Sequence, residues 1–137
     1  MNNAFRGERY FLSNMYPCRI VLSGYEFTCA EAAFQACKDG SRVKEFAGLD
    51  GYDAKRLGRR VKLSPNWLDA RVGYMKIIVR EKFRQNPDLA AKLLATGEEE
   101  LVEENTWADT FRGRVNGKGL NTLGEILMEV REEMEQA

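Results

Sequence analysis

Three polar side chains stand at helical spacing within an otherwise apolar run of this chain. Glu31, Gln35 and Lys38 are separated by Ala, Phe and Cys residues. In a helix, spacings of four and seven place them on one stripe, within about 40° of each other at about 100° per residue. A surface ion pair bridged by Gln35 explains this spacing too, and on spacing alone it is favoured. The functional interpretation is a buried carboxylate, with a pKa raised by desolvation, beside an ammonium group.

The absence of histidine narrows the chemistry of any site. Ser-His-Asp catalysis, Cys-His catalysis and His-ligated metals are excluded. Cys18, Cys29 and Cys37 lack CxxC spacing, so we interpret them as reduced thiols of a cytoplasmic protein. We expect no metal and no cofactor, and proton transfer by carboxylates, amines, thiols or phenols, or by the substrate itself.

A basic cluster lies on a short helix expected at Asp53–Val61. It contains Lys55, Arg56, Arg59 and Arg60. A solvated helix face is the default interpretation. The functional alternative is phosphate recognition, because guanidinium groups match phosphate oxygens.

A third candidate is the segment Asn105–Leu120, which holds three glycines together with Trp107, Asp109 and Arg112. A loop this long inside a compact domain is usually functional or disordered, and its two aromatic residues argue against disorder. Close backbone approach at Gly113, ring stacking and one carboxylate suit a nucleotide-like ligand. The loop feeds a helix, whose N-terminus attracts anions.

The bulk composition indicates one globular domain. The chain has 137 residues, of which 44% are hydrophobic and 31% charged, with a formal net charge of zero. A general binder of phosphate backbones usually carries a basic excess, which is missing here. We found no apolar run of membrane length and no secretory leader, so we expect a cytoplasmic protein that does not associate with membranes.

The elements that must position these residues begin with a hairpin. Arg19–Leu22 and Tyr25–Thr28 flank Ser23-Gly24, a two-residue turn signal. The apolar helix follows, with Thr28 as its expected N-cap and Glu31 at capping-box spacing.

The rest of the chain is predominantly helical in pattern. Ser64 and Pro65 are the expected N-cap and first residue of a long helix. Another helix is expected to start at Pro87 and end near Gly97. We expect residues 10–18 and 105–119 to be loops. The apolar stripes are Leu68, Val72, Met75, Val79 and Phe83 on the long helix and Leu123, Ile126, Leu127 and Val130 on the last.

These segments, in this order, resemble the NADAR superfamily of YbiA-like proteins. The resemblance spans nearly the whole chain, and its specificity comes from the ordered set rather than from any one motif. It rests on Phe11-Leu12-Ser13-Asn14, Tyr16-Pro17, Gly24, Glu31 with Gln35 and Lys38, Ala54-Lys55, Leu57-Gly58-Arg59, Trp67, Met75, Lys82-Phe83, Leu94, Thr96-Gly97, Glu103, Asp109, Gly113, Gly117–Gly119, Asn121, Leu123-Gly124, Leu127-Met128 and Arg131.

The resemblance implies a mainly helical α+β fold in a single domain, residues 1–137, with a small antiparallel element near the N-terminus. It implies hydrolysis of an N-glycosidic bond between ribose and a base-like nitrogen. Implied substrates are ADP-ribose on guanine and ribosylamino-pyrimidine phosphates of riboflavin synthesis. The zero net charge favours a small ligand or single-stranded nucleic acid over duplex DNA as the carrier of the guanine. The implied catalytic residues are Glu31, Lys38 and Asp109. The candidate substrate contacts are Ser13, Asn14, Gln35, Lys55, Arg59, Trp107, Arg112, Gly113 and Asn121.

Two positions depart from the family pattern. Arg112 stands before Gly113 where relatives usually carry Trp, so either Trp107 takes over stacking or Arg112 stacks or holds a phosphate. Thr122 stands where relatives often carry His.

In the implied reaction, positive charge develops on the ribose and negative charge on the leaving base. Either Asp109 or Glu31 stabilises the ribose side or activates water, and Lys38 acts either as general acid or as a Schiff-base nucleophile. The alternatives are a glycosidase of riboflavin intermediates, a silent module that binds ADP-ribose, and a helical interaction domain.

Overall fold

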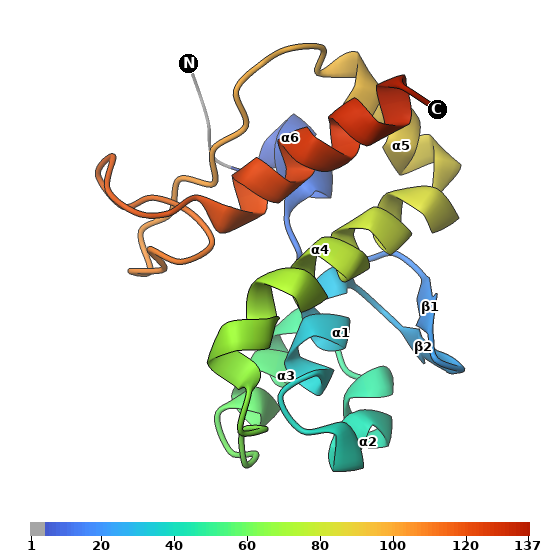
Figure 1. The fold of residues 1–137 in the computed structure, drawn as a ribbon, viewed down its shortest axis with the longest axis vertical. Helices are drawn as coiled ribbons and strands as arrows, with labels where there is room; N and C mark the ends of the chain where they lie inside the picture. The colour runs from blue at the N-terminus through green and yellow to red at the C-terminus, as the bar shows by residue number, and fades with distance from the viewer. Residues whose placement is uncertain (1–4) are drawn as a thin grey trace. The chain divides into compact units, whose positions relative to one another are not determined.

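The computed structural model describes residues 5–137, which form two compact units (Figure 1). The central unit is Asn14–Asn86, and the terminal unit joins the residues up to Ser13 with Pro87–Ala137. Helices predominate, and the one regular sheet among the described residues has two strands, which confirms the expected mainly helical α+β fold. None of the described helices is long and apolar enough to cross a membrane.

The hairpin of the central unit confirms the sequence prediction. Strands β1 (Ile20–Leu22) and β2 (Tyr25–Phe27) pair antiparallel, with Ile20 opposite Phe27. Ser23 and Gly24 have φ angles of 50° and 83°, as a two-residue hairpin turn requires.

Three short helices follow: α1 (Ala30–Ala36), α2 (Val43–Ala47) and α3 (Gly51–Gly58). Helix α1 packs against both α2 and α3, and all seven of its residues are buried. The buried residues of α3 are Gly51, Ala54 and Gly58, which recur every three or four positions. Small side chains on both helices allow their backbones to approach closely.

The expected start of α1 is wrong. Its N-cap is Cys29, which makes no side-chain capping bond. The Thr28 hydroxyl instead donates to the Leu49 carbonyl at 2.6 Å, and the main-chain N–H of Glu31 donates to the Asn14 carbonyl at 2.8 Å. Tertiary contacts of Thr28 and Glu31 therefore replace the capping box.

Helix α4 (Trp67–Gln85) begins later than expected, with Asn66 rather than Ser64 as its N-cap. The Ser64 hydroxyl donates to the Lys38 carbonyl at 3.1 Å, and its main-chain N–H donates to the same oxygen at 2.8 Å. These bonds tie the entry of α4 to the end of α1.

The apolar stripe predicted for α4 is half right. Met75, Val79 and Phe83 are buried, whereas Leu68 and Val72 are 71% and 46% exposed. The first turns of α4 are covered on another face, where Trp67 packs on Phe34 with ring centroids 5.0 Å apart. The full buried set of α4 is Trp67, Met75, Ile78, Val79, Lys82 and Phe83.

The terminal unit contains a 3₁₀ helix, η1 (Gly7–Leu12), and the helices α5 (Pro87–Ala95) and α6 (Thr122–Glu135). Part of the loop expected at residues 10–18 is therefore helical. The predicted start of α5 is confirmed, and Gly97 has a φ of 63° just beyond α5. The predicted buried residues of α6 are confirmed as Leu123, Ile126, Leu127 and Val130.

The segment before α6 forms the expected loop, with isolated bridges but no helix or strand over residues 105–119. Main-chain hydrogen bonds order it: Arg114 N–H donates to the Glu103 carbonyl at 2.8 Å, and Leu120 N–H donates to the Thr110 carbonyl at 2.7 Å. Its glycines permit these close approaches, since a Cβ on Gly113 would collide with the Glu103 backbone.

Candidate functional site

A buried pair on α1 forms the centre of the candidate site. Glu31 is 0% exposed and Gln35 is 3% exposed. The Gln35 amide Nε2 donates to the Glu31 Oε2 at 2.6 Å, one helical turn away. The surface-edge interpretation is therefore wrong for these two residues. A carboxylate is rarely fully buried without a polar partner, and here an amide supplies one.

Lys38 lies two residues beyond the end of α1 and is half-buried. Its Nζ is 5.8 Å from the ring centroid of Trp67, within cation–π range. Trp67 stacks in turn on Tyr74, with ring centroids 6.2 Å apart. Aromatic packing therefore flanks the ammonium group at the end of the stripe.

Asn14 adjoins the buried pair through its main chain, which accepts the Glu31 N–H. Its side chain is buried, and neither amide atom has a partner among the described residues. The Oε1 of Gln35 is likewise buried and unpartnered in this part of the chain. Unsatisfied buried polar groups are rare in folded proteins, so these amides have unused hydrogen-bonding capacity beside Glu31.

The basic cluster lies on and just after α3. Arg56 pairs with Asp53, one turn earlier, as in an ordinary solvated helix face. Lys55 is half-buried, and Arg59 and Arg60 are exposed. Within the described residues these last three make no ion pair, so their charges are available to a phosphate.

The second candidate carboxylate, Asp109, lies in the terminal unit. Its Oδ1 accepts the main-chain N–H groups of Phe111 and Arg112 at 3.2 and 2.9 Å. Its Oδ2 is 3.5 Å from Nε of Arg112, whose side chain is largely buried. Asn105 fixes the Asp109 backbone from both sides, through its Nδ2 and Oδ1. Asp109 is therefore part of the hydrogen bonding that shapes the loop.

The remaining predicted contacts in the terminal unit differ in exposure. Trp107 is 57% exposed, whereas Asn121 is 0% exposed. The Asn121 Oδ1 accepts the Glu103 N–H and its Nδ2 donates to the Leu101 carbonyl, each at 3.0 Å. Asn121 thus joins residues 101–103, which precede the loop, to the start of α6. Ser13, just after η1, is half-buried.

Lys82 is a buried ionisable residue that sequence analysis did not single out as a candidate. It is 1% exposed, and its Nζ lies 5.9 and 5.3 Å from the ring centroids of Tyr16 and Phe83. Desolvation by burial lowers the pKa of Lys82 to about 8. The sequence did contain a signal for this burial: Lys82 follows Met75 and Val79 at helical spacing, on the face of α4 that is buried.

Two thiols of the central unit, those of Cys29 and Cys37, are unsuited to nucleophilic attack. Desolvation by burial raises the pKa of Cys37 to about 11 and also raises the pKa of Cys29. The Cys37 thiol donates to the Ala33 carbonyl within α1. Both thiols therefore stay protonated near neutral pH, as expected of side chains that pack rather than react.

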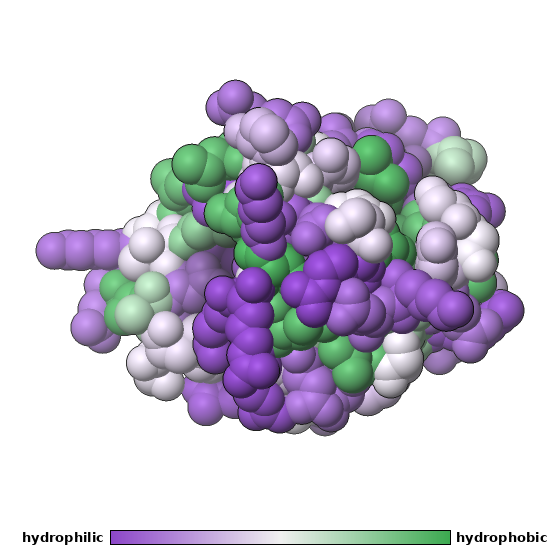
Figure 2. Space-filling view, turned by 90° about the horizontal axis from the view of Figure 1, so that it is seen from below, coloured by the Kyte–Doolittle hydropathy of each residue, from purple (hydrophilic) through white to green (hydrophobic). Residues whose placement is uncertain are grey.

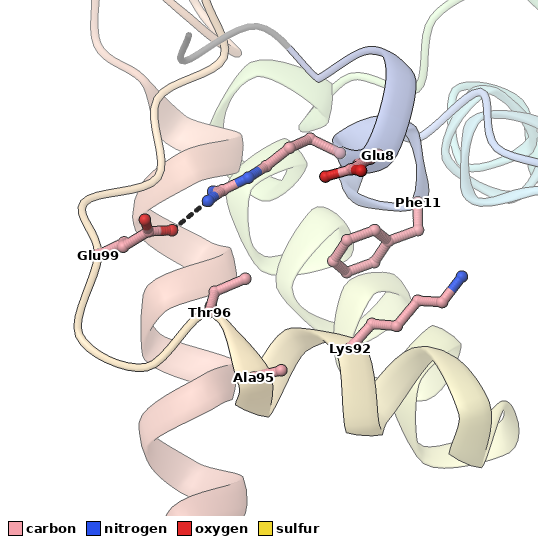
Figure 3. A pocket seen from close by; sticks show the side chains of 7 residues that line it. Glu8, Phe11, Lys92, Ala95, Thr96 and Glu99 are labelled. Atoms are coloured by element: carbon pink, nitrogen blue, oxygen red, sulfur yellow. Dashed lines mark hydrogen bonds and ion pairs between the residues drawn. The ribbon is translucent and has the colours of Figure 1, made fainter. Parts of the chain in front are cut away.

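Each unit also contains a surface cleft that none of the predicted site residues lines. The cleft of the terminal unit has a volume of about 560 Å³ and is crossed by an ion pair of Arg9 with Glu99 (Figure 3). Lys92 lies over the Phe11 ring on its other side. A smaller cleft, about 270 Å³, lies between the hairpin, α1 and α2 in the central unit.

The surface in Figure 2 shows hydrophobic side chains in small groups between long hydrophilic ones. The exposed large hydrophobic residues of the central unit are Tyr25, Tyr52, Leu63, Leu68, Val72 and Ile77.

No cluster of three or more His, Cys, Asp or Glu side chains within the described residues could hold a metal ion.

Comparison with known sequences finds one family model, the NADAR domain, matching residues 3–135. The chain is 45% identical over 132 residues to a riboflavin biosynthesis protein of Vibrio vulnificus, covering 92% of this chain but only 36% of that protein. It is 38% identical over 128 residues to the N-glycosidase YbiA of Escherichia coli, covering 89% of this chain and 79% of YbiA. An N-glycosidase of Nostoc punctiforme is 41% identical over 131 residues, with 89% and 83% covered.

Comparison with solved structures gives the same relative. The fold resembles the NMR structure of E. coli YbiA with a TM-score of 0.85 and 34% sequence identity. The match covers 99% of this chain and 88% of that one.

Proposed function

This chain belongs to the NADAR domain family, and from that premise we propose that it is a cytoplasmic N-glycosidase that removes ADP-ribose from guanine bases. Hydrolysis of an N-glycosyl bond follows from family membership and from the relatives named N-glycosidases. The guanine-linked substrate, free or in single-stranded nucleic acid, is our inference from the sequence motifs.

The buried hydrogen bond between Glu31 and Gln35 carries the proposal. The Gln35 amide donates to Glu31, a hydrogen bond that an ionised carboxylate can accept, and we propose that Glu31 acts in this form. Positive charge that develops on the ribose ring is attracted to such a carboxylate, most strongly where water is excluded. We assign Glu31 to the ribose side, where it stabilises the cation or orients the attacking water.

Lys38 is assigned to the leaving group or to the sugar. As a general acid it gives a proton to the departing base nitrogen while water adds to the anomeric carbon. As a nucleophile its amine attacks the anomeric carbon, the bond from that carbon to the base nitrogen breaks, and the base leaves with a proton. The opened sugar is then held on Lys38 as an imine, and water hydrolyses the imine to release the sugar and regenerate the amine. Trapping with borohydride separates the two routes, because only the second leaves a reduced adduct on Lys38.

The loop of the terminal unit contributes further proposed contacts. We propose Asp109 as a second catalytic carboxylate and Arg112 as a phosphate or stacking contact in place of Trp. The buried guanidinium of Arg112, 3.5 Å from the Asp109 carboxylate, supports a linked role for the two side chains. The further proposed substrate contacts are Ser13, Asn14, Gln35, Lys55, Arg59, Trp107, Gly113 and Asn121.

A second candidate function is removal of ribosylamino-pyrimidine phosphates. It is favoured by the similarity to the V. vulnificus protein named for riboflavin biosynthesis, although this chain spans about a third of that protein. A third candidate is a module that binds ADP-ribose without cleaving it. It is suggested by Arg112, which stands where relatives usually carry Trp.

A substrate panel tests these proposals. The protein is incubated with ADP-ribosylated guanosine, with the same adduct in an oligonucleotide, and with a ribosylamino-pyrimidine phosphate, and the products are identified by mass. We expect release of guanine-containing product and free ADP-ribose. Cleavage of the pyrimidine alone would support the second function. Calorimetric ADP-ribose binding without cleavage of any substrate would support the third and contradict the enzyme assignment.

A further inference from the structure

Gly58, at the C-terminal end of α3, lies against the polar stripe of α1. A Cβ placed on Gly58 would overlap the Gln35 Oε1, and it would lie 2.9 Å from the Gln35 Cδ and 3.4 Å from the Lys38 Nζ. The first two separations are shorter than real carbon contacts allow. The bare backbone of Gly58 therefore leaves the space that the Gln35 amide fills.

Conformation does not explain this glycine. Gly58 is not among the glycines with a positive φ, so its backbone suits an L-residue. Alanine is also the better helix former, and on propensity alone it would stabilise α3. The requirement at Gly58 is space for the amide of a neighbouring helix.

The Gln35 amide has a defined orientation in that space. Its Nε2 donates to Glu31, and its Oε1 is directed at Gly58 without a partner among the described residues. Gln35 is 3% exposed, so a displaced amide has little room to regain the same hydrogen bond from another rotamer. Displacement of the Oε1 therefore disturbs the donor to Glu31 as well.

We propose that Gly58 is a positioning residue, which seats the Gln35 amide so that it donates to Glu31 and leaves Lys38 space at the same point. The effect of Gly58 on kcat rests on the proposed function, whereas its effect on the position of the Gln35 amide does not. Because the obstructing atom is the end of a flexible side chain, Gly58→Ala should fold and act mainly on Glu31.

A double-mutant cycle over Gly58→Ala and Gln35→Ala tests the proposal. We expect each single variant to lower kcat about tenfold to a hundredfold, the loss typical for a hydrogen bond to a charged group. Because Gln35→Ala removes the colliding atoms, the double variant should lose no more than Gln35→Ala alone. Additive losses would show that Gly58 acts independently of Gln35, which overturns the proposal.

Gly51→Ala is the matched control, since Gly51 is a buried glycine on the same helix. A Cβ there would meet the Met15 Sδ at 2.6 Å, the Met15 Cε at 3.0 Å and the Cys29 Sγ at 3.4 Å, and none of these three nearest atoms belongs to the stripe. We expect Gly51→Ala to change the melting temperature but to leave kcat within about twofold of wild type. A loss of kcat equal to that of Gly58→Ala would attribute both effects to α3 packing and overturn the proposal.

A readout without activity separates this inference from the proposed function. The side-chain amide ¹H–¹⁵N resonances of Gln35, assigned by their absence in Gln35→Ala, report its hydrogen bond to Glu31. They should shift in Gly58→Ala and stay unchanged in Gly51→Ala. Unshifted resonances in Gly58→Ala would overturn the positioning role even if wild type cleaves its substrate. Shifted resonances in a protein that cleaves none of the panel would retain this role and contradict only the proposed function.

Discussion

Two carboxylates of this molecule are held in different ways. Glu31 lies on a regular helix, is fully buried, and accepts a hydrogen bond from a side-chain amide. Asp109 lies in an irregular loop and is partly exposed. It accepts hydrogen bonds from two main-chain N–H groups, and its other oxygen pairs with the Arg112 side chain. A carboxylate that accepts main-chain N–H groups stabilises the local backbone conformation. The backbone around Glu31 is already held by the hydrogen bonds of its helix, so its side chain is not needed for that purpose. On this comparison Glu31 is the stronger candidate for chemistry and Asp109 for loop structure.

The largest expected effect is that of Glu31→Gln. Replacing the carboxylate by an amide of the same shape removes the charge that faces the developing cation, so kcat should fall about a hundredfold to a thousandfold. Steady-state kinetics on the substrate that the panel selects measures this loss. Circular dichroism at the assay temperature is the control for folding. Near-wild-type kcat in a folded variant would remove Glu31 from the mechanism.

Asn121→Ala tests how far side-chain hydrogen bonds to the backbone stabilise the terminal unit around the loop. It deletes two hydrogen bonds and leaves the Glu103 N–H and the Leu101 carbonyl buried without partners. We expect a loss of about 2–4 kcal/mol in the free energy of unfolding, measured in urea. Asn116→Ala, an exposed position in the same loop, is the matched control: Asn116 and Asn121 both have a left-handed φ of 53°, so both variants carry the same backbone strain, and only Asn121→Ala should also lose the two hydrogen bonds. Equal stability of the two variants would contradict the structural role of Asn121.

Asp109→Asn gives a smaller expected effect on kcat. The amide Oδ1 can still accept the N–H groups of Phe111 and Arg112, so the loop should persist. Loss of the charge beside Arg112 should lower kcat about tenfold. Limited proteolysis of the loop checks that it stays ordered. A loss of kcat as large as that of Glu31→Gln would make Asp109 an equal partner in catalysis.

A third carboxylate, Glu81 on α4, calibrates an ordinary surface pair. The hydrogen bond from Arg84 lowers the pKa of Glu81 to about 2. Because the pKa in the folded state is below that of the unfolded chain, the stability is present above about pH 4.5 and is lost between pH 4.5 and 2.

Solvent screens this pair, since Arg84 is 66% exposed, so its contribution should stay below about 1 kcal/mol. Thermal unfolding of wild type and Glu81→Gln between pH 7 and 2 measures the difference in stability between the two proteins. This difference should shrink to zero at the acid end of that range, and a difference that stays constant with pH would contradict the titration of Glu81.

Local pattern predicted the parts of the fold that local chemistry determines. The Ser23-Gly24 turn fixes the hairpin, and Leu123, Ile126 and Leu127 follow the buried face of α6 as expected. The sequence predicted that Glu31 and Gln35 share one face of a helix. Only the structure shows that this face is buried rather than at the surface.

Tertiary contacts determine what the sequence could not predict. Thr28 is not a cap because the Leu49 carbonyl takes its hydroxyl, and Ser64 is not one because it bonds to Lys38. Hydropathy alone assigns a lysine to the surface, which hid Lys82 on the buried face of α4. The space at Gly58 depends on how α3 meets α1, which one sequence does not reveal.

The most direct test of the comparison is a side-by-side measurement of initial rates for wild type, Glu31→Gln and Asp109→Asn on ADP-ribosylated guanosine, with released ADP-ribose identified by mass. We predict cleavage by wild type, a loss of about a hundredfold to a thousandfold for Glu31→Gln, and a loss of about tenfold for Asp109→Asn. The reverse order of the two losses, or no cleavage by wild type, would contradict the account.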